Sequence, residues 1–270
     1  MGSIWASLSD MMVTILNTFY SFTGSYGMAI IILTVIIRIL LHPLSHKQMV
    51  SMQKMQKLQP RIKTLQEKYK DDKETLNREI MTMYKENKVN PAAGCLPLLV
   101  QLPILILLFR VLLKLQYPGT SNLFLGIQLN GSVLSTLAAA LGQASAEGVR
   151  VGFGTVLSAL SANPEGLLNF GFYVPNLILL IVISGLTWLQ QKMTSTGGNP
   201  QMAMMSWFMP IFLTFICLSL QGGVLLYWGA SSLIGVAQQW WVMHKTKVEM
   251  QEKPAVYKDK PAGTQSGKQK

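Results

Sequence analysis

Five apolar stretches constrain this chain more than any other feature of its sequence. Each is close to the roughly 20 residues that a helix needs to cross a hydrocarbon core of about 30 Å. Their bounds are 26–46, 94–116, 174–191, 202–221 and 223–243. Because only 13% of the residues are charged, against roughly 25% in a soluble domain, we expect an all-α polytopic membrane protein with five transmembrane helices. The composition argues against a soluble globular protein and a disordered chain, and two cysteines argue against a disulfide-linked scaffold.

The positive charges between these spans set the expected direction of the helices. Segment 45–94 contains eleven Lys and Arg residues, the tail after residue 244 contains seven, and segment 117–173 contains one. Cytoplasmic segments of membrane proteins carry the excess of Lys and Arg. We therefore expect segment 45–94 and the C-terminus in the cytoplasm, and the N-terminus and segment 117–173 outside.

Three segments flank or join the spans. Residues 117–173 form an extracytoplasmic region in which we find no motif, and residues 244–270 predict a basic, disordered cytoplasmic tail. This tail could touch anionic lipid, or it could contact ribosomal RNA or a targeting factor. Residues 1–25 predict an amphipathic helix on the outer face of the membrane, because their apolar residues recur at helical spacing: Ile4, Trp5, Leu8, Met11, Met12, Ile15, Leu16 and Phe19.

Residues 47–90 are amphipathic, with an apolar residue every three or four positions among lysines and glutamines. Asp71 and Glu74 have the spacing of a capping box, so the pattern predicts a cytoplasmic antiparallel helical hairpin, kinked at Pro60. Packing of one helix on the other would account for the apolar stripe. Alternatively, its methionines, which are flexible and suit varied apolar partners, contact a substrate chain. The candidates are Met49, Met52, Met55, Met81 and Met83.

Several motifs occur together around this hairpin. It has a paired-Asp turn, it leads into Asn-Pro-x-x-Gly-Cys-Leu-Pro at 90–97, and Gln101-x-Pro103 follows within the second span. The fifth span adds Gly-Val-Leu-Leu-Tyr-Trp at 223–228, and the first has Arg38 one turn before His-Pro-Leu. These motifs resemble the YidC-type membrane protein insertases, the family of the mitochondrial Oxa and chloroplast Albino proteins. The resemblance implies a bacterial plasma-membrane protein whose five helices enclose a hydrophilic groove, closed to the outside but open to cytoplasm and lipid.

Arg38 is the leading candidate for a functional residue. A charge within a span costs at least ~2.5–3.5 kcal/mol on insertion scales, so the side chain either reaches to the cytoplasmic end or faces a polar groove. The resemblance implies the groove. Thr34 and Gln101 are further polar candidates for its lining, and the resemblance adds Gln190 and Trp228. Each of the polar residues could instead make an interhelical hydrogen bond, worth ~0.6 kcal/mol on average.

With the resemblance, these residues predict a membrane protein insertase and chaperone that is not an enzyme. It would pass hydrophilic tails of nascent membrane proteins through a positively charged groove and release their transmembrane segments into lipid. The alternative is a small channel or solute carrier with a through-going polar path, but the absence of Asp and Glu from the spans argues against proton coupling. No catalytic residue, cofactor or metal is expected.

The expected partners follow from the same reading. They are nascent membrane proteins, the lipid bilayer, the ribosome or a targeting factor at the basic tail and hairpin, and a general translocon. We expect the monomer to be the functional unit.

Overall fold

The computed structural model describes residues 2–87, 89–90, 96–115, 122–143, 151–194 and 200–252. Nearly all of these residues are helical, so the prediction of an all-α fold is confirmed. The elements in chain order are α1 (Gly2–Thr23), α2 (Tyr26–Leu40), α3 (His42–Lys68), α4 (Lys73–Glu86), α5 (Leu96–Lys114), β1 (Leu123–Phe124), β2 (Ile127–Gln128), α6 (Val133–Ala140), α7 (Phe153–Ala162), the 3₁₀ helix η2 (Pro164–Leu168), α8 (Phe170–Thr194), α9 (Pro200–Cys217) and α10 (Gly222–Glu252).

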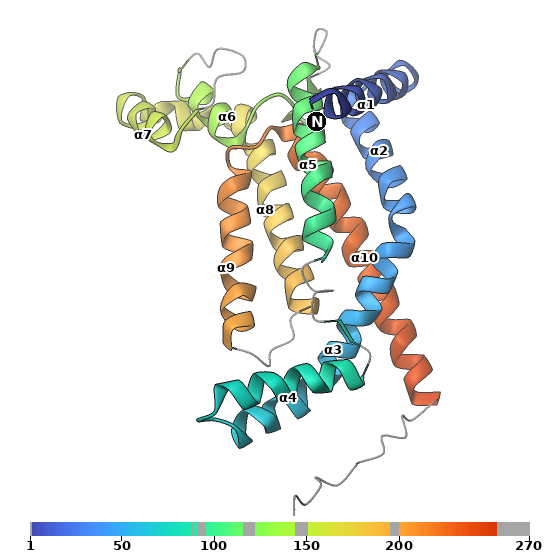
Figure 1. Cartoon of the computed structure of the whole chain (residues 1–270). Helices are drawn as coiled ribbons and strands as arrows, with labels where there is room; N and C mark the ends of the chain where they lie inside the picture. Colours follow the sequence, from blue (N-terminus) through green and yellow to red (C-terminus); the bar gives the residue numbers. More distant parts are fainter. Residues whose placement is uncertain are drawn as a thin grey trace, which may run out of the picture.

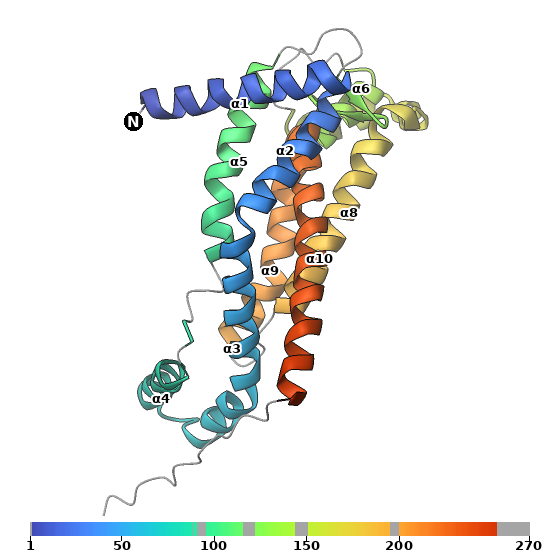
Figure 2. The ribbon, with the colours of Figure 1, turned by 90° about the vertical axis from the view of Figure 1, so that its right-hand side faces the viewer.

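The body of the molecule is a bundle in which α2, α5, α8, α9 and α10 run alongside one another (Figures 1 and 2). Helix α10 packs extensively on α8 and α2, and α1 packs across α2 and α5 at one end. We call this the α1 end. The pair α3 and α4 projects at the opposite end, which we call the hairpin end. Among the residues that the structure describes, α8 is the one helix long and apolar enough to cross a membrane, and α2 with α3 is a second candidate if the bent pair counts as one span.

The first apolar stretch is not one straight helix to residue 46. Helix α2 ends at Leu40, α3 begins at His42, and their axes differ by 63°. Pro43 lies in the first turn of α3, where a proline ring is tolerated, but deeper in a helix the same ring would clash with the carbonyl four residues earlier. The chain therefore breaks at Leu41, and Arg38 lies in the last turn of α2.

The hairpin is held by its own apolar core, in which α4 packs on α3. The buried members are Met55, Leu58, Ile62, Met83, Tyr84 and Val89. Helix α4 is capped by Asp72 and not by Asp71, because the carboxylate of Asp72 accepts a hydrogen bond from the Thr75 backbone N–H (3.0 Å). Helix α3 continues through Pro60 to Lys68, so this proline does not end it.

A short β-hairpin closes the α1 end. Its two strands are joined by Leu125 and Gly126, both with positive φ (50° and 82°), the backbone of a tight two-residue hairpin turn. A Cβ at Gly27 would overlap the ring of Phe124, so glycine is needed for β1 to lie against α2. The segment 117–173 is thus structured where it is described, although its sequence carried no motif that we could interpret.

Asn176 of α8 fastens this β-hairpin to the bundle. Its side chain is fully buried, its Oδ1 accepts from the Gln128 N–H (2.8 Å), and its Nδ2 donates to the carbonyl oxygens of Gln128 (3.1 Å) and Gly131 (3.3 Å). The Gly222 N–H donates to the Gly131 carbonyl (2.8 Å), so the turn before α10 joins the same network. A buried amide that satisfies backbone groups in this way fixes their positions.

The C-terminal tail begins later than the sequence predicted. Helix α10 continues to Glu252, so residues 244–252 are helical and not disordered. The stretch from Lys245 to Glu252 contains neither glycine nor proline, and the first proline is Pro254, so nothing there stops a helix. Residues 253–270, the rest of the predicted tail, lie outside the described residues.

Candidate functional site

The charged centre of the candidate site is Arg38. Its side chain is half-buried between helices, and its Nε donates a hydrogen bond to the Oγ of Ser231 on α10 (2.8 Å). Ser231 is itself buried, with 1% of its surface exposed. The guanidinium therefore turns toward the bundle and not along the surface. A charge drawn into an apolar bundle is costly, which makes this contact a candidate for function.

Gly235, one turn beyond Ser231, makes room for two polar side chains to meet. A Cβ on Gly235 would lie 2.5 Å from the Nε2 of Gln190 and 3.3 Å from the Nη2 of Arg38. Gln190 comes from α8 and Arg38 from α2, so three helices meet at this glycine. The lack of a side chain at 235 lets the amide and the guanidinium approach the α10 backbone closely.

Tyr227 extends the polar contacts toward the α1 end. The Nε2 of Gln101 on α5 donates to the Tyr227 hydroxyl (3.3 Å), and the tyrosine is 1% exposed. Tyr227, Ser231 and Gly235 are spaced by four residues, so they share one face of α10. Gln238 continues this face by nearly one further turn, and its Nε2 lies 3.2 Å from the Nδ1 of His42. We call Tyr227, Ser231, Gly235 and Gln238 the α10 stripe.

Polar side chains are also buried in α3, at the hairpin end of the bundle. Gln53 is 9% exposed, and neither its amide nitrogen nor its amide oxygen has a hydrogen-bond partner among the described residues; the same holds for the Oε1 of Gln238. Gln56 donates to the Met193 carbonyl at the end of α8 (2.7 Å). An unpaired buried amide costs roughly 1–3 kcal/mol. The hairpin end therefore carries hydrogen-bonding capacity that the described chain does not use.

The structure brings three of the predicted site residues together and separates two others. Arg38 and Gln190 meet at Gly235, and Gln101 contacts Tyr227 on the same stripe. Thr34 lies one turn before Arg38, but it is fully buried and donates to the Ile30 carbonyl of its own helix (2.7 Å). Its hydroxyl is thus satisfied locally.

Trp228 does not lie beside Arg38. It is half-buried and lines a small internal space between α8 and α9, with Ser184, Thr187 and Thr214. The physical reason is helical geometry, since consecutive residues point about 100° apart around a helix and Tyr227 occupies the face toward α2 and α5. The Thr214 hydroxyl of α9 donates to the Ser184 hydroxyl of α8 (2.9 Å). This is an interhelical hydrogen bond, the alternative to lining a groove that we gave above for polar residues in the spans.

The hairpin methionines divide into two groups. Met55 and Met83 are buried in the hairpin core, at 1% and 9% exposure, which is the packing alternative. Met49 and Met52 are half-buried, and Met81 is 47% exposed. In this conformation only the second group presents side-chain surface to a partner.

Ser231 and Gly235 were not among the residues that sequence reasoning selected, and Tyr227 was noted only within a motif. Their four-residue spacing within an apolar span is a signal that could have identified them, since small or polar residues on one helix face mark a close interhelical contact. The spacing alone does not tell which neighbouring helix the face meets.

Comparisons with known proteins give matches along most of this chain. Residues 18–251 match the family model described as "60Kd inner membrane protein". The chain is 37% identical over 236 residues to the membrane protein insertase YidC of Nitratidesulfovibrio vulgaris, covering 87% of this chain and 38% of that protein. It is 36% identical over 245 residues to the membrane protein insertase YidC of Fusobacterium nucleatum, covering 91% of this chain and 99% of that protein.

A solved structure gives the same picture of the fold. The crystal structure of an active YidC insertase, with its first transmembrane domain resolved, matches with a TM-score of 0.62 and 27% sequence identity. The match covers 88% of this chain and 46% of that chain. The chain therefore spans less than half of this structure and of the Nitratidesulfovibrio protein, but nearly the whole length of the Fusobacterium protein.

Proposed function

Since the chain belongs to the 60Kd inner membrane protein family, we propose that it acts as a membrane protein insertase. Its clients are nascent membrane proteins. A hydrophilic tail of the client enters along the α10 stripe, and the client's transmembrane segment passes into lipid. Burial of that segment, at about 25 cal/mol per Å² of apolar surface, drives the step without a chemical reaction.

The observation that carries this proposal is the meeting of Arg38 and Gln190 at Gly235. In the apolar bundle, the guanidinium attracts acidic or polar groups more strongly than it would in water. Its Nε donates to Ser231, while its Nη2 and the Gln190 Nε2 both lie close to the position that a Cβ would take on Gly235. A client tail in this position gains charged and neutral hydrogen bonds that lipid does not offer.

The two ends of the bundle differ in a way that favours insertion over conduction. Toward the hairpin end, the α10 stripe continues to Gln238, whose Nε2 lies 3.2 Å from the Nδ1 of His42, and the Oε1 of Gln238 and the amide of Gln53 on α3 have no partner among the described residues. Toward the α1 end, Leu112, Leu129 and Val224 form an apolar layer in which each is at most 2% exposed, and the buried Asn176 amide is paired with backbone groups, although the Oε1 of Gln221 has no partner among the described residues. A polar path that stops at an apolar closure supports an insertase. A through-going path would be needed for the channel or carrier that is the second candidate.

We place the hairpin end in the cytoplasm and the α1 end outside, in a bacterial plasma membrane that the bundle crosses five times. The support is the bias of Lys and Arg toward segment 45–94 and the C-terminal tail. In this orientation the hairpin meets the arriving client first, and its accessible methionines Met49, Met52 and Met81 offer apolar contact. The ribosome, a targeting factor and a general translocon are proposed partners on the same side, with the monomer as the working unit.

Release of the client is proposed to occur between α8 and α10. These helices pack closely where Gly229 faces Leu179 and Ile183, at 3.4 and 3.3 Å from the position of a Cβ. Gln190 lies three turns further toward the hairpin end. A client segment would therefore leave between the parts of α8 and α10 that lie nearer the hairpin end. The parts of the two helices that pack closely at Gly229 would separate last.

The test uses proteoliposomes and an insertase-dependent single-span client with an acidic tail. Arg38→Ala should lower the initial insertion rate strongly, and Arg38→Lys should retain part of it because the charge remains but the planar donor set is lost. Lys114→Ala is the matched control, since Lys114 is an exposed cation paired with Asp10 at the α1 end (3.1 Å). Normal insertion by Arg38→Ala would refute the proposed role, and solute conductance by the parent protein would favour the channel.

A further inference from the structure

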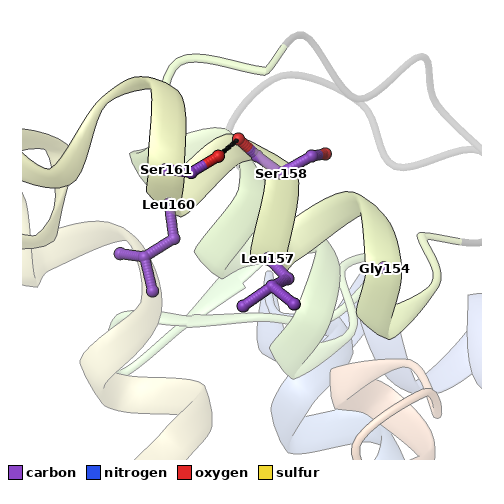
Figure 3. Close-up of a pocket in the computed structure, with 5 residues that line it drawn as sticks. All are labelled: Gly154, Leu157, Ser158, Leu160 and Ser161. Atoms are coloured by element: carbon purple, nitrogen blue, oxygen red, sulfur yellow. Dashed lines mark hydrogen bonds between the residues drawn. The ribbon is translucent and has the colours of Figure 1, made fainter.

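Helix α7 has an apolar face that the bundle covers only in part. Val156 and Ala159 are buried against α6, whereas Phe153 and Leu157, on the adjoining part of the same face, are 64% and 60% exposed. Figure 3 shows Leu157 and Leu160 pointing to one side of α7, and Ser158 and Ser161 to the opposite side. Isolated exposed apolar residues are ordinary, but here they form a continuous stripe on an amphipathic helix.

The surface beside α7 has little to offer a polar ligand. An open hollow of about 480 Å³ is lined by Gly154, Leu157, Ser158, Leu160 and Ser161. Both serine hydroxyls already donate to carbonyl groups of their own helix, Ser158 to Thr155 (2.9 Å) and Ser161 to Ser158 (2.8 Å). Between residues 151 and 173, the sequence contains one charged residue, Glu165. The part of this face that the bundle leaves exposed therefore suits an apolar partner.

The position of α7 identifies that partner. Helix α7 lies at the α1 end of the bundle, out to the side on which α9 runs in Figure 1. The outward surface of α9 is strongly apolar, with Phe208, Ile211, Phe212 and Phe215 each 44–66% exposed, in keeping with contact with lipid chains. Just after α7, Leu168, Phe170 and Phe172 are 71%, 57% and 51% exposed. The exposed face of α7 thus continues the lipid-facing surface of the bundle.

We propose that α7, with the segment from Leu168 to Phe172, is an interfacial anchor that lies in the lipid headgroup region at the α1 end. Helices of this kind bury their apolar face about 5–10 Å into the boundary between headgroups and acyl chains. The serine face then points to water. A second copy of this chain or another protein is the alternative occupant, but neither explains why the apolar face continues that of α9.

An anchor at this place would hold the closure of the α1 end at a fixed depth. Helix α7 packs on α6, and the Leu134 N–H of α6 donates to the Leu218 carbonyl at the end of α9 (3.3 Å). Through α6, the depth of α7 in the interface is thus coupled to the turn that leads from α9 into α10. This role is independent of whether Arg38 binds clients.

The experiment compares labels on the two faces of α7 in the full chain. Leu157→Cys and Ser158→Cys are made in a Cys95→Ser background that keeps the buried Cys217, and the background alone reports any labelling of that cysteine. Each variant carries an environment-sensitive nitrobenzoxadiazole label. The proteins are reconstituted in phosphatidylcholine and phosphatidylglycerol vesicles with or without a lipid that bears a shallow doxyl quencher.

The label at 157 should emit at shorter wavelength and lose more than half of its intensity to the doxyl lipid, while the label at 158 should remain essentially unquenched. Phe153→Cys and Ser161→Cys form a second pair on the same two faces, in case one variant of the first pair does not fold. Equal quenching on both faces, or no quenching on either, would overturn the proposal. So would a label at 157 that is shielded from water but not quenched by lipid and becomes exposed on dilution of the protein, because that result identifies a second copy as the occupant.

Discussion

Gly235→Ala is the substitution that tests the geometry of the candidate site most finely. It adds one methyl group at the place where Arg38 and Gln190 meet. The new Cβ would lie 2.5 Å from the Gln190 Nε2, which must retreat by about 0.9 Å to reach the ordinary contact distance of 3.4 Å. The Nη2 of Arg38, at 3.3 Å, needs to move only slightly.

Both displaced atoms are the ends of flexible side chains, so the stability of the protein should change little. Alanine in place of glycine also favours the helix by up to about 1 kcal/mol, which offsets part of any crowding. The cost should fall on client binding. A hydrogen bond to a charged group contributes about 1.5–3 kcal/mol, and 1.4 kcal/mol is a factor of ten in rate or affinity. We expect the insertion rate to fall about tenfold or more.

Gly185→Ala is the matched control, because it places the same substitution in another helix of the bundle. Gly185 is exposed on α8, and a Cβ there would have nothing within 4 Å apart from α8 itself. The assay is the initial rate of protease-protected insertion in proteoliposomes, with thermal unfolding in detergent measured for both variants. The reasoning is refuted if Gly235→Ala inserts at the parental rate, or if Gly185→Ala loses as much activity with equal stability.

Three further outcomes test the packing around the site. Asn176→Leu should lower the free energy of unfolding by about 3 kcal/mol, because it leaves the buried N–H and carbonyl of Gln128 unpaired at about 1–3 kcal/mol each. An unchanged thermal midpoint in detergent would contradict this role of Asn176. Met55→Ala should lower the free energy of unfolding by about 2–5 kcal/mol because it empties part of the hairpin core, and Met81→Ala should lower it by less than about 0.5 kcal/mol. Equal thermal midpoints of the two variants would contradict the division between buried and exposed methionines. The hydrogen bond from Thr75 lowers the pKa of Asp72. The ionised Asp72 cap therefore stabilises α4 fully above the ordinary carboxyl pKa of about 3.9, and this stabilisation is lost as the pH falls through the lowered pKa of Asp72. Hydrogen exchange in the first turn of α4, corrected for the intrinsic rate, should therefore rise in acid for the parent and not for D72N, and equal pH profiles would contradict this cap.

The fold class and the family could be predicted because their signals are local. Apolar windows, the charge bias and the amphipathic hairpin pattern each depend on neighbouring residues, and the motifs around Gln101 and Arg38 carried a resemblance that the family match confirms. The break at Leu41 also had a local signal, since a proline such as Pro43 is favoured in the first turn of a helix, but the length of the apolar stretch concealed it.

The faces of α10 could not be predicted, because they depend on how the helix is rotated in the bundle. Tyr227 and Trp228 are adjacent in a span whose polar residues come in adjacent pairs, at 231–232 and 238–239, and so lie on more than one face. Periodicity therefore does not say which of the two aromatic residues meets α2. The hydrogen bonds of Asn176 to the β-hairpin could not be predicted for a similar reason. It joins residues 48 positions apart, and the short strands that it holds have no periodic pattern of their own.

The gap at Gly235 shows the same limit from another side. A glycine in a transmembrane helix commonly allows two helices to approach, and the sequence alone gives no means to distinguish that use from a space filled by polar side chains. Only the positions of Gln190 and Arg38 make the distinction. The individual residues of the site can thus be recognised in the sequence, whereas the place where they meet depends on how the helices pack.

The most direct test of the central claim is photocrosslinking to a stalled nascent chain from residues that lie against the α10 stripe. A photoreactive amino acid at Gln101 or Gln190 should crosslink to the hydrophilic tail of a single-span client, whereas the same group at Leu113, which is 53% exposed on the outward surface of α5, should not. Crosslinks to the tail from Leu113 alone, or from none of these positions in a chain that still inserts the client, would contradict a polar site between α2, α8 and α10 as the path of the client.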